Sequence, residues 1–257
     1  MIDPDSPDFV ASFARGLAVI RSFGSEAPRQ TLTEVAERTG MTRAAARRFL
    51  LTLCSLGYAH SDGKHYELAP QVMEIGYTYL QSLSITETIH PFLMQVTEQL
   101  QESSSAAVLD GESVVYVARS AARHRVMAIS LSIGARLPAH CSSMGQVLLA
   151  QLEPSRLAHF LRTARLERYT DNTITDPALL ALRLKEVREQ GWALCNQELE
   201  IGLRSMAVPL HDRHGNVTLA MNVSGQATRV SVEALKQDYL PVLQEAAAEF
   251  EKTQKLR

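Results

Sequence analysis

The sequence has few cysteines, no strong net charge and no long apolar run, and each absence narrows the choice of protein class. Cys54, Cys141 and Cys195 are far apart and odd in number, so they form neither a disulfide framework nor a CxxC zinc spacing. A net charge of −2 means that any affinity for nucleic acid must come from local clusters of basic residues. The chain has no run of about 18 apolar residues and opens on "MIDPDSPDF" instead of a basic and apolar leader, so we expect a cytoplasmic protein.

The first quarter of the chain predicts three helices. "SFARGLAVIRSF" places apolar residues at helical spacing, and "LTEVAERT" follows with Thr31 or Thr33 as its cap and Gly40 as its stop. Thr42 then caps a longer helix that runs through Leu56. Two helices joined by a glycine-containing turn are the plan of a helix-turn-helix, in which the second helix enters the DNA major groove.

The second of these helices carries three arginines and no acid on its outer face. Arg43, Arg47 and Arg48 can reach phosphates or the O6 and N7 atoms of guanine, while Ala44 keeps the helix slim enough to approach base edges. "YAHSDGKHYEL" then predicts a hairpin with an Asp-Gly turn, which is the wing of a winged helix. The candidate DNA-binding residues are Thr42, Arg43, Ala44, Arg47, Arg48 and Lys64.

The alternative is an amphipathic helix whose arginines are merely solvated. The local charge favours the DNA-binding interpretation. Residues 1–68 hold eight basic and eight acidic side chains, but three of the acids, Asp3, Asp5 and Asp8, precede the helices. The winged unit therefore carries about +3, which suits a dimer at a specific site better than a nonspecific coating protein.

The rest of the chain predicts a second, α+β domain. "PQVMEIGYTYLQSL" has apolar residues three and four apart and predicts a connecting helix, and residues 86–101 predict another helix. Strands are predicted in "SSAAVLD", "ESVVYVARS", "VMAISLSIG" and "MAVPLHDRHGNVTLAMNVSG", with helices between them and one at the end, so the sheet is antiparallel or mixed. The predicted domains are a winged helix-turn-helix over 10–69, a connecting helix over 70–85 and an effector-binding domain over 86–257.

The motifs "SFARGLAVIRSF", "GARLPAHCSSMGQVLLA", "QELEIGLRSMAVPL" and "AMNVSG", in this order, resemble the IclR family of bacterial transcription regulators over essentially the whole chain. "RGLAVI" and "RRFLLTLCSLGY" are similar to the branch that controls catabolism of protocatechuate, 4-hydroxybenzoate and β-ketoadipate. The resemblance implies a homodimer or tetramer, operator DNA and a small organic acid as partners, and a GAF-like domain with a mixed sheet and flanking helices. It also implies an activator, with RNA polymerase as a further candidate partner, and no cofactor.

The resemblance also implies an effector site. Family members hold the ligand carboxylate on the backbone amides of a Gly-X pair before "RLP", here Gly134 and Ala135. In relatives that bind small acids, four side chains complete the site, and we expect His140 to line it as well. The four matching positions here are Cys195, Ser205, Asn222 and Ser224.

Three of those four positions depart from the family pattern, and the departure at Cys195 replaces an acid. The resemblance therefore implies a changed effector, for which an aromatic acid is the first candidate and a small aliphatic acid such as glyoxylate or pyruvate the alternative. An aromatic acid needs apolar walls and is helped by a cation, for which Arg119, Arg136 and Arg204 are the candidates. The alternative is that these arginines brace the sheet through backbone and carboxylate contacts. The candidate walls are Met127, Ile129, Leu131, Leu148 and Met221.

Two motifs point to other chemistry. "HDRH" at 211–214 resembles a metal-ligand pair, but it lies between strands beside Gly215, which favours a solvated hairpin loop and no metal. His140 and Cys141 could form a nucleophile pair of an enzyme with an ancillary winged helix. A capping role for Ser142 or Ser143 explains the same residues, and no third orienting group is evident, so we expect no enzyme.

Overall fold

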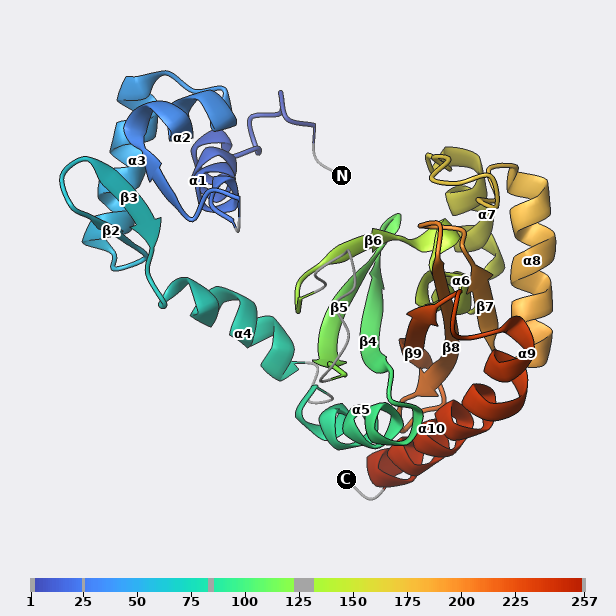
Figure 1. Ribbon diagram of the computed structural model, residues 1–257. Helices are drawn as coiled ribbons and strands as arrows, with labels where there is room; N and C mark the ends of the chain where they lie inside the picture. Colours follow the sequence, from blue (N-terminus) through green and yellow to red (C-terminus); the bar gives the residue numbers. More distant parts are fainter. Residues whose placement is uncertain (1–2, 25, 83–85, 123–131, 256–257) are drawn as a thin grey trace. The chain divides into compact units, whose positions relative to one another are not determined.

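The computed structural model of the chain describes residues 3–24, 26–82, 86–122 and 132–255 (Figure 1). The chain divides into two compact units, residues 1–82 and 83–257. No helix among the described residues is long and apolar enough to cross a membrane. The finer domain limits at 10–69, 70–85 and 86–257 stay predictions.

The N-terminal unit is a helical unit with a small sheet. Its elements are α1 (Ala11–Ser22), β1 (Arg29–Thr31), α2 (Leu32–Thr39), α3 (Arg43–Ser55), β2 (Ala59–Ser61), β3 (His65–Leu68) and α4 (Val72–Ser82). Helices α1, α2 and α3 pack around a core centred on Val19, Val35 and Leu50, none of which is exposed to solvent.

Local sequence explains where α2 begins and ends. Thr31 is its N-cap and forms a capping box with Glu34, so Thr31 and not Thr33 has this role. Gly40 ends the helix with a φ of 66°, in the left-handed region that glycine adopts without steric cost. The hairpin β2–β3 forms the predicted wing, and β1 adds an unexpected third strand by pairing with β3.

The C-terminal unit is built around an antiparallel sheet. Its strands are β4 (Ser103–Asp110), β5 (Ser113–Ser120), β6 (Arg136–Pro138), β7 (Ala193–Asn196), β8 (Leu203–His211) and β9 (Val217–Gln226). They lie in the order β6-β5-β4-β9-β8-β7, and all five pairings are antiparallel. The α+β fold is thus confirmed, and the sheet as described is antiparallel where an antiparallel or mixed sheet was expected.

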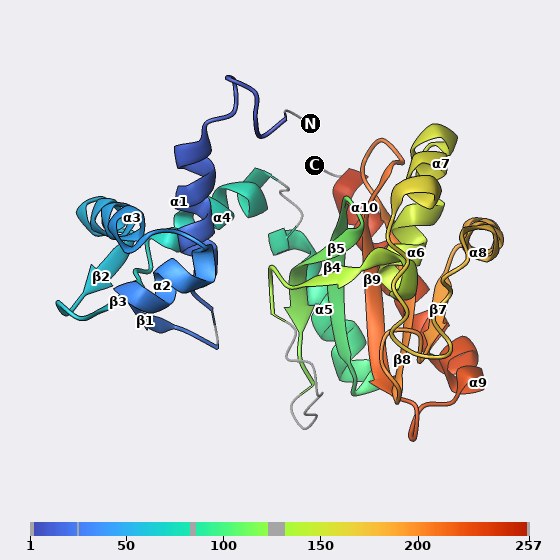
Figure 2. The same ribbon diagram turned by 90° about the horizontal axis from the view of Figure 1, so that it is seen from above.

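Helices cover both faces of this sheet. They are α5 (Thr86–Leu100), η1 (Ala139–Cys141), α6 (Ser143–Ala150), α7 (Pro154–Thr163), α8 (Pro177–Gln190), α9 (Val232–Ala234), the π-helical turn η2 (Leu235–Tyr239) and α10 (Leu240–Lys255). Helices α5 and α10 lie side by side, with the rings of Phe92 and Phe250 edge to face at 5.9 Å (Figure 1). Figure 2 shows α8 beside the β7 edge of the sheet.

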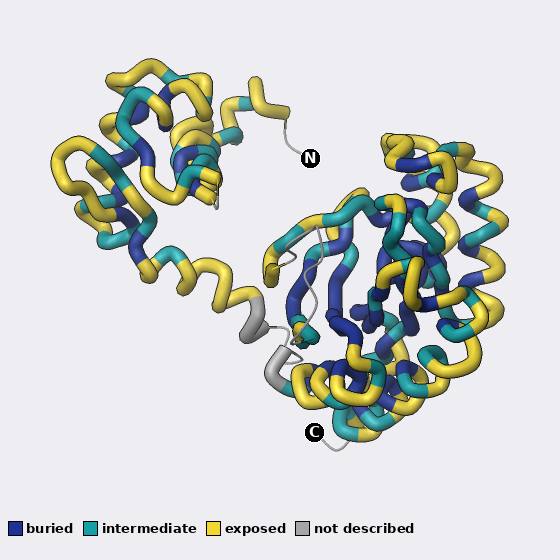
Figure 3. The backbone as a smooth tube through the Cα atoms, viewed as in Figure 1, coloured by how far each residue is buried: buried dark blue, intermediate teal, exposed yellow. Residues whose placement is uncertain are grey.

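Helix α6 lies on the other face and is buried along its whole length (Figure 3). It can approach the sheet closely because the residues beneath it are small. These are Ala107, Ala193, Ala207 and Ala220. Gly145 is part of the same close packing, since a Cβ atom there would lie 2.2 Å from the carbonyl oxygen of Ala139. This packing fixes the first turn of α6 above the sheet.

One predicted strand lies largely outside the described residues, and one predicted helix is divided. The strand expected in "VMAISLSIG" falls largely at 123–131, outside the described residues, and only the turn before β6 is described there. The predicted single terminal helix is interrupted by η2, which ends two residues before Pro241 in α10. Proline has no N–H to donate to the preceding turn, and this accounts for the local widening.

Candidate functional site

Helix α3 presents a basic face on the surface of the N-terminal unit. Thr42 is its N-cap and accepts a hydrogen bond from the Ala45 amide at 3.2 Å, which fixes the start of the helix. Ala46, Leu50 and Leu53 are buried, so the opposite face is turned outward. The outward residues are Thr42, Arg43, Ala44, Arg47 and Arg48, and all five are exposed.

The charges on this face are available to a partner. Within the described chain, Arg43, Arg47 and Arg48 make no ion pair with an acid. The acid of the wing, Asp62, is bound by Arg29 and by the backbone amides of the turn, which also lower its pKa. Lys64 is exposed at the tip of the wing. The arrangement therefore offers unpaired cations on a helix and a wing of one unit.

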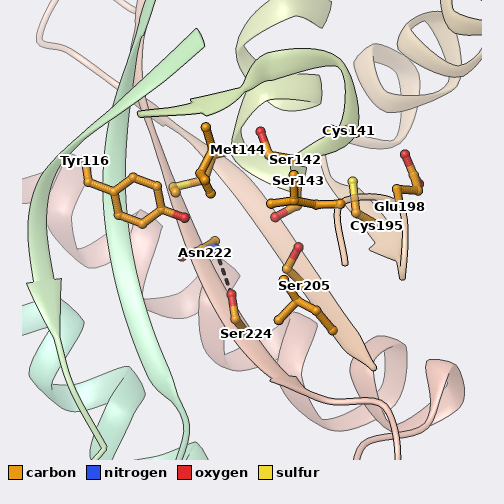
Figure 4. Close-up of a pocket in the computed structure, with 13 residues that line it drawn as sticks. Tyr116, Cys141, Ser142, Ser143, Met144, Cys195, Glu198, Ser205, Asn222 and Ser224 are labelled. Atoms are coloured by element: carbon orange, nitrogen blue, oxygen red, sulfur yellow. Dashed lines mark hydrogen bonds between the residues drawn. The ribbon is translucent and has the colours of Figure 1, made fainter. Parts of the chain in front are cut away.

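A pocket lies in the C-terminal unit between the first turn of α6 and the sheet (Figure 4). The cross-strand register explains how distant residues meet there. Cys195 pairs with Ser205 and Ser205 with Ser224, so the three side chains form a row across β7, β8 and β9. Asn222 shares their face because it is two residues from Ser224 on β9. The lining is Tyr116, Leu137, Cys141, Ser142, Ser143, Met144, Cys195, Glu198, Leu199, Leu203, Ser205, Asn222 and Ser224.

Several buried polar atoms of this pocket have no partner within the described protein. The hydroxyls of Ser142 and Ser143 and the Oδ1 atom of Asn222 make no hydrogen bond, although these residues are 7%, 1% and 3% exposed. Ser142 is the N-cap of α6 yet makes no capping bond with its side chain. The first amides of a helix also lack an intrahelical acceptor and carry partial positive charge. Such groups are costly when unpaired, so the pocket is built to receive a polar ligand.

Glu198 places one carboxylate at the edge of the pocket. Its Oε2 atom accepts a hydrogen bond from Gln146 Nε2 at 2.8 Å, and its Oε1 atom lies 3.8 Å from Arg183 Nη1. Burial raises the pKa of Glu198, an effect that Arg183 and Gln146 oppose. The pocket lining has no lysine or arginine, so Glu198 is its one formally charged group among the described residues.

The two thiols of the pocket are unsuited to nucleophilic chemistry. Burial raises the pKa of Cys141 to about 12 and the pKa of Cys195 well above its ordinary value. His140 does not activate Cys141, because its Nε2 atom is 3.0 Å from the Glu167 carbonyl oxygen and burial lowers its pKa. A reactive cysteine needs a lowered pKa. The arrangement therefore does not support the alternative of a Cys-His enzyme.

Three of the predicted effector residues lie away from this pocket. Gly134 and Ala135 do not line it, and their amides already donate to the carbonyls of Tyr116 at 2.8 Å and Ser132 at 3.0 Å. His140 is buried but borders a separate, more open hollow with Tyr169. The structure thus brings together Cys195, Ser205, Asn222 and Ser224, the four positions carried over for side chains, and separates them from the remaining three.

The predicted walls and cations that the structure describes do not line the pocket. Met221 is on the opposite face of β9 from Asn222, and Leu148 packs into the core beneath α6, while Met127, Ile129 and Leu131 lie outside the described residues. Arg204 donates to Asn196, Ala227 and Val230, and Arg136 pairs with Asp110. Arg119 is on β5 and does not line the pocket. None of the three arginines borders the pocket.

The side chains of the "HDRH" motif at 211–214 make contacts within the protein. His211 Nδ1 contacts Glu251 Oε1, and Asp212 accepts hydrogen bonds from the amides of its own turn. Among the described residues, no group of three His, Cys, Asp or Glu side chains could hold a metal ion.

Comparison with known proteins places both units in one family. Residues 12–63 match the IclR helix-turn-helix domain, and residues 77–251 match the bacterial transcriptional regulator IclR C-terminal domain. The chain is 44% identical over 244 residues to the Pca regulon regulatory protein of Pseudomonas putida, covering 95% of this chain and 84% of that protein. The chain belongs to the IclR family of bacterial transcriptional regulators. A second IclR relative, the p-hydroxybenzoate hydroxylase transcriptional activator of Acinetobacter baylyi, is 37% identical over 95% of this chain and 91% of its own.

Solved IclR structures agree with this fold. A transcriptional regulator of Rhodococcus sp. RHA1 is 44% identical, with a TM-score of 0.86 over 96% of this chain and 99% of that one. A double mutant of the PobR inducer-binding domain from Acinetobacter, in complex with 3-hydroxybenzoic acid, is 32% identical, with a TM-score of 0.61 over 65% of this chain and 97% of that one. Members of the IclR family regulate transcription and are not enzymes, which confirms the expected class.

Three features of the pocket were not predicted from the sequence. Tyr116 comes from a strand that was predicted but given no role, and burial raises its pKa to about 12. Ser142 and Ser143 were considered only as helix caps. Glu198 lies within the quoted motif "QELEIGLRSMAVPL", where a charged residue close behind a buried strand was the available signal.

Proposed function

We propose that this protein is an operator-binding regulator of aromatic-acid catabolism whose C-terminal unit binds a small organic acid. The observation that carries the proposal is the enclosed pocket with unpaired serine hydroxyls at the start of α6, in a chain whose other unit exposes an unpaired arginine helix. Two relatives support an aromatic acid as the effector. One is named as the activator of p-hydroxybenzoate hydroxylase, and the PobR domain was solved in complex with 3-hydroxybenzoic acid.

Each predicted domain has its own proposed role. The winged helix over 10–69 binds DNA through Thr42, Arg43, Ala44, Arg47, Arg48 and Lys64, the helix over 70–85 connects, and 86–257 senses the effector. The protein acts as a homodimer or tetramer in the cytoplasm, as an activator that works with RNA polymerase. Exposed Met73, Ile75 and Tyr77 on α4 support self-association, since Met73 and Tyr77 are one turn apart and Ile75 adds a further exposed apolar side chain to the same helix.

The effector carboxylate binds at the first turn of α6. Ser142 and Ser143 supply hydroxyl donors there, and the helix amides supply partial positive charge without a counter-ion. Ser205 and Ser224 line the opposite wall beside Cys195 and Asn222. This assignment replaces the amides of Gly134 and Ala135, which are occupied in the structure.

Effector binding must enlarge the pocket, and this gives a route to regulation. The free volume is about 20 Å³, enough for roughly one water molecule. An aromatic ring requires side chains such as Met144 and Leu199 to move, and the effector then stabilises the opened form. Differential affinity for the two forms supplies the coupling to DNA binding, typically about 1–3 kcal/mol.

The small free volume also favours a second candidate, a sensor of glyoxylate or pyruvate, because either fits with less rearrangement. Thermal unfolding of the protein with 4-hydroxybenzoate, protocatechuate, β-ketoadipate, glyoxylate and pyruvate separates the two. A saturating aromatic acid at about 100 times its Kd adds about 2.7 kcal/mol of stability. Stabilisation by glyoxylate or pyruvate alone would replace the aromatic assignment with the small-acid one.

The coupling is tested with operator DNA. Titrations of labelled operator with and without the stabilising acid should give dissociation constants that differ about 5- to 150-fold. Equal constants would contradict an effector-responsive regulator, even if the acid binds.

A further inference from the structure

The pocket has two chemically different sides. At the first turn of α6, the unpaired hydroxyls of Ser142 and Ser143 can donate hydrogen bonds to an anion. At the Cys195 side, the carboxylate of Glu198 can only accept when it is ionised (Figure 4). A ligand that spans the pocket can therefore place an acceptor beside the serines, which donate or accept, but needs a donor beside the ionised Glu198.

Two contacts of Glu198 favour the ionised, accepting form of its carboxylate, against the raised pKa that burial gives it. Gln146 donates to one oxygen at 2.8 Å, and Arg183 lies 3.8 Å from the other. The Arg183 side chain is 37% exposed whereas that of Glu198 is 6% exposed, so solvent screens the arginine more than the acid. When Glu198 is ionised, its charge borders a pocket whose lining, among the described residues, has no lysine or arginine.

We propose that Glu198 sets effector specificity: it accepts a hydrogen bond from a hydroxyl of the effector and excludes effectors that carry a second carboxylate. The proposal rests on the proposed function, since it concerns the same pocket. It selects hydroxylated aromatic monoacids from the three effector types considered above and disfavours β-ketoadipate, which has a carboxylate at each end.

Electrostatic interactions with Glu198 explain why a hydroxyl group on the effector is preferred to a second carboxylate. A second ligand carboxylate would have to be desolvated beside a buried like charge, where the low dielectric strengthens repulsion. A hydroxyl in the same place gains a charge-assisted hydrogen bond. An effector with only hydrogen there avoids repulsion but makes no bond, so it should bind with intermediate affinity.

The test uses benzoates that differ at one ring position. Isothermal titration of the full-length protein would compare 3- and 4-hydroxybenzoate with benzoate and with the dicarboxylates isophthalate and terephthalate. We expect at least one hydroxybenzoate to bind about 10- to 100-fold more tightly than benzoate, and its matching dicarboxylate to bind more weakly than benzoate. A dicarboxylate that binds as tightly as benzoate, or hydroxybenzoates no better than benzoate, would overturn the proposal.

Substitutions of Glu198 test whether this residue causes the preference among the benzoates. In Glu198→Gln the affinity for the dicarboxylates should rise relative to benzoate, and in Glu198→Ala the preference for hydroxybenzoate should fall to within about threefold of benzoate. Glu102→Gln is the matched control, because Glu102 is equally buried and lies beside Arg229 but does not line the pocket. Unchanged ranking in both Glu198 variants would overturn the assignment.

The outcomes separate this inference from the proposed function. Binding of benzoates without the predicted ranking removes only the role of Glu198. No binding of any acid in the series removes both the aromatic effector and the inference. If the Glu198 variants do not fold, the ranking shown by the unaltered protein still decides whether the selection exists.

Discussion

The two units use charge in opposite ways. The N-terminal unit holds its cations on the surface, where Arg43, Arg47 and Arg48 are exposed and make no ion pair with an acid among the described residues. The C-terminal unit buries neutral donors and one carboxylate, Glu198, in a nearly closed pocket. Solvated charges act at a distance and cost little to keep, whereas buried polar groups without partners cost free energy until a ligand satisfies them. This difference predicts that substitutions on the basic face will change DNA binding, whereas substitutions around the pocket will change stability or acid binding.

The largest expected effect is on packing in the C-terminal unit. Gly145→Ala should lower the free energy of unfolding by about 3 kcal/mol or more, because the new Cβ atom would lie 2.2 Å from the Ala139 carbonyl oxygen. Gly76→Ala on α4 is the matched helix substitution, with nothing within 4 Å of the new atom, and should be neutral or stabilising by about 1 kcal/mol. Thermal unfolding of both variants checks this, and equal effects would show that α6 is not tightly seated.

The next effect concerns DNA binding. Arg47→Ala should weaken operator binding by about 1–3 kcal/mol, with lost discrimination at one base pair if Arg47 contacts guanine. Stability should be unchanged because the side chain is exposed and unpaired. Arg156→Ala on α7 makes the same charge change on an exposed helix of the other unit and serves as the control. Equal operator affinity in Arg47→Ala and the unaltered protein, measured by fluorescence anisotropy, would contradict the placement of the recognition helix.

A smaller effect distinguishes buried hydroxyls that await a ligand from those that support the fold. Ser143→Ala should leave the melting temperature of the free protein unchanged or slightly raised, since its hydroxyl has no partner, but weaken acid binding about tenfold. Thr170→Ala should cost about 1–2 kcal/mol of stability, because its hydroxyl donates to the Gln197 carbonyl at 2.7 Å. Thermal unfolding and titration calorimetry on both variants test the contrast. A clear loss of stability in Ser143→Ala would show that this hydroxyl has a structural role.

The same contrast explains how much the sequence could predict. The helices of the N-terminal unit followed from local signals, namely apolar spacing, the Thr31 cap and the Gly40 stop. Strand β1 was missed because three residues carry no alternation, and its pairing of Gln30 with Tyr66 is a contact across the unit. In the same way, local helix signals placed the exposed face of α3 correctly.

The pocket depends on non-local contacts, so periodicity alone could not find it. The resemblance supplied Cys195, Ser205, Asn222 and Ser224, and strand register brings these positions together. The resemblance also supplied Gly134 and Ala135, which do not line this pocket and whose amides bond to neighbouring carbonyls. Glu198 was missed because it lies in the irregular segment after Gln197, whose φ of 58° turns the chain in a way that no strand pattern signals. The binding roles of all these residues stay predictions.

The smallest predicted effect is a pH dependence in the C-terminal unit. Burial raises the pKa of Glu198 above its ordinary value of 4.5, so the folded state holds this proton more tightly than the unfolded state. Its contribution to stability is therefore complete below pH 4.5 and is lost as the pH rises through the raised value. Glu198→Gln, which cannot ionise, should gain stability relative to the unaltered protein as the pH rises through that window. Glu189→Gln removes an exposed carboxylate of α8 that lies beside Lys185, and it controls for net charge. Chemical denaturation across the window measures all three proteins. A stability difference between Glu198→Gln and the unaltered protein that does not change with pH would mean that Glu198 is solvated like a surface acid. The C-terminal unit would then have no buried charge in its pocket to contrast with the exposed arginines of the N-terminal unit.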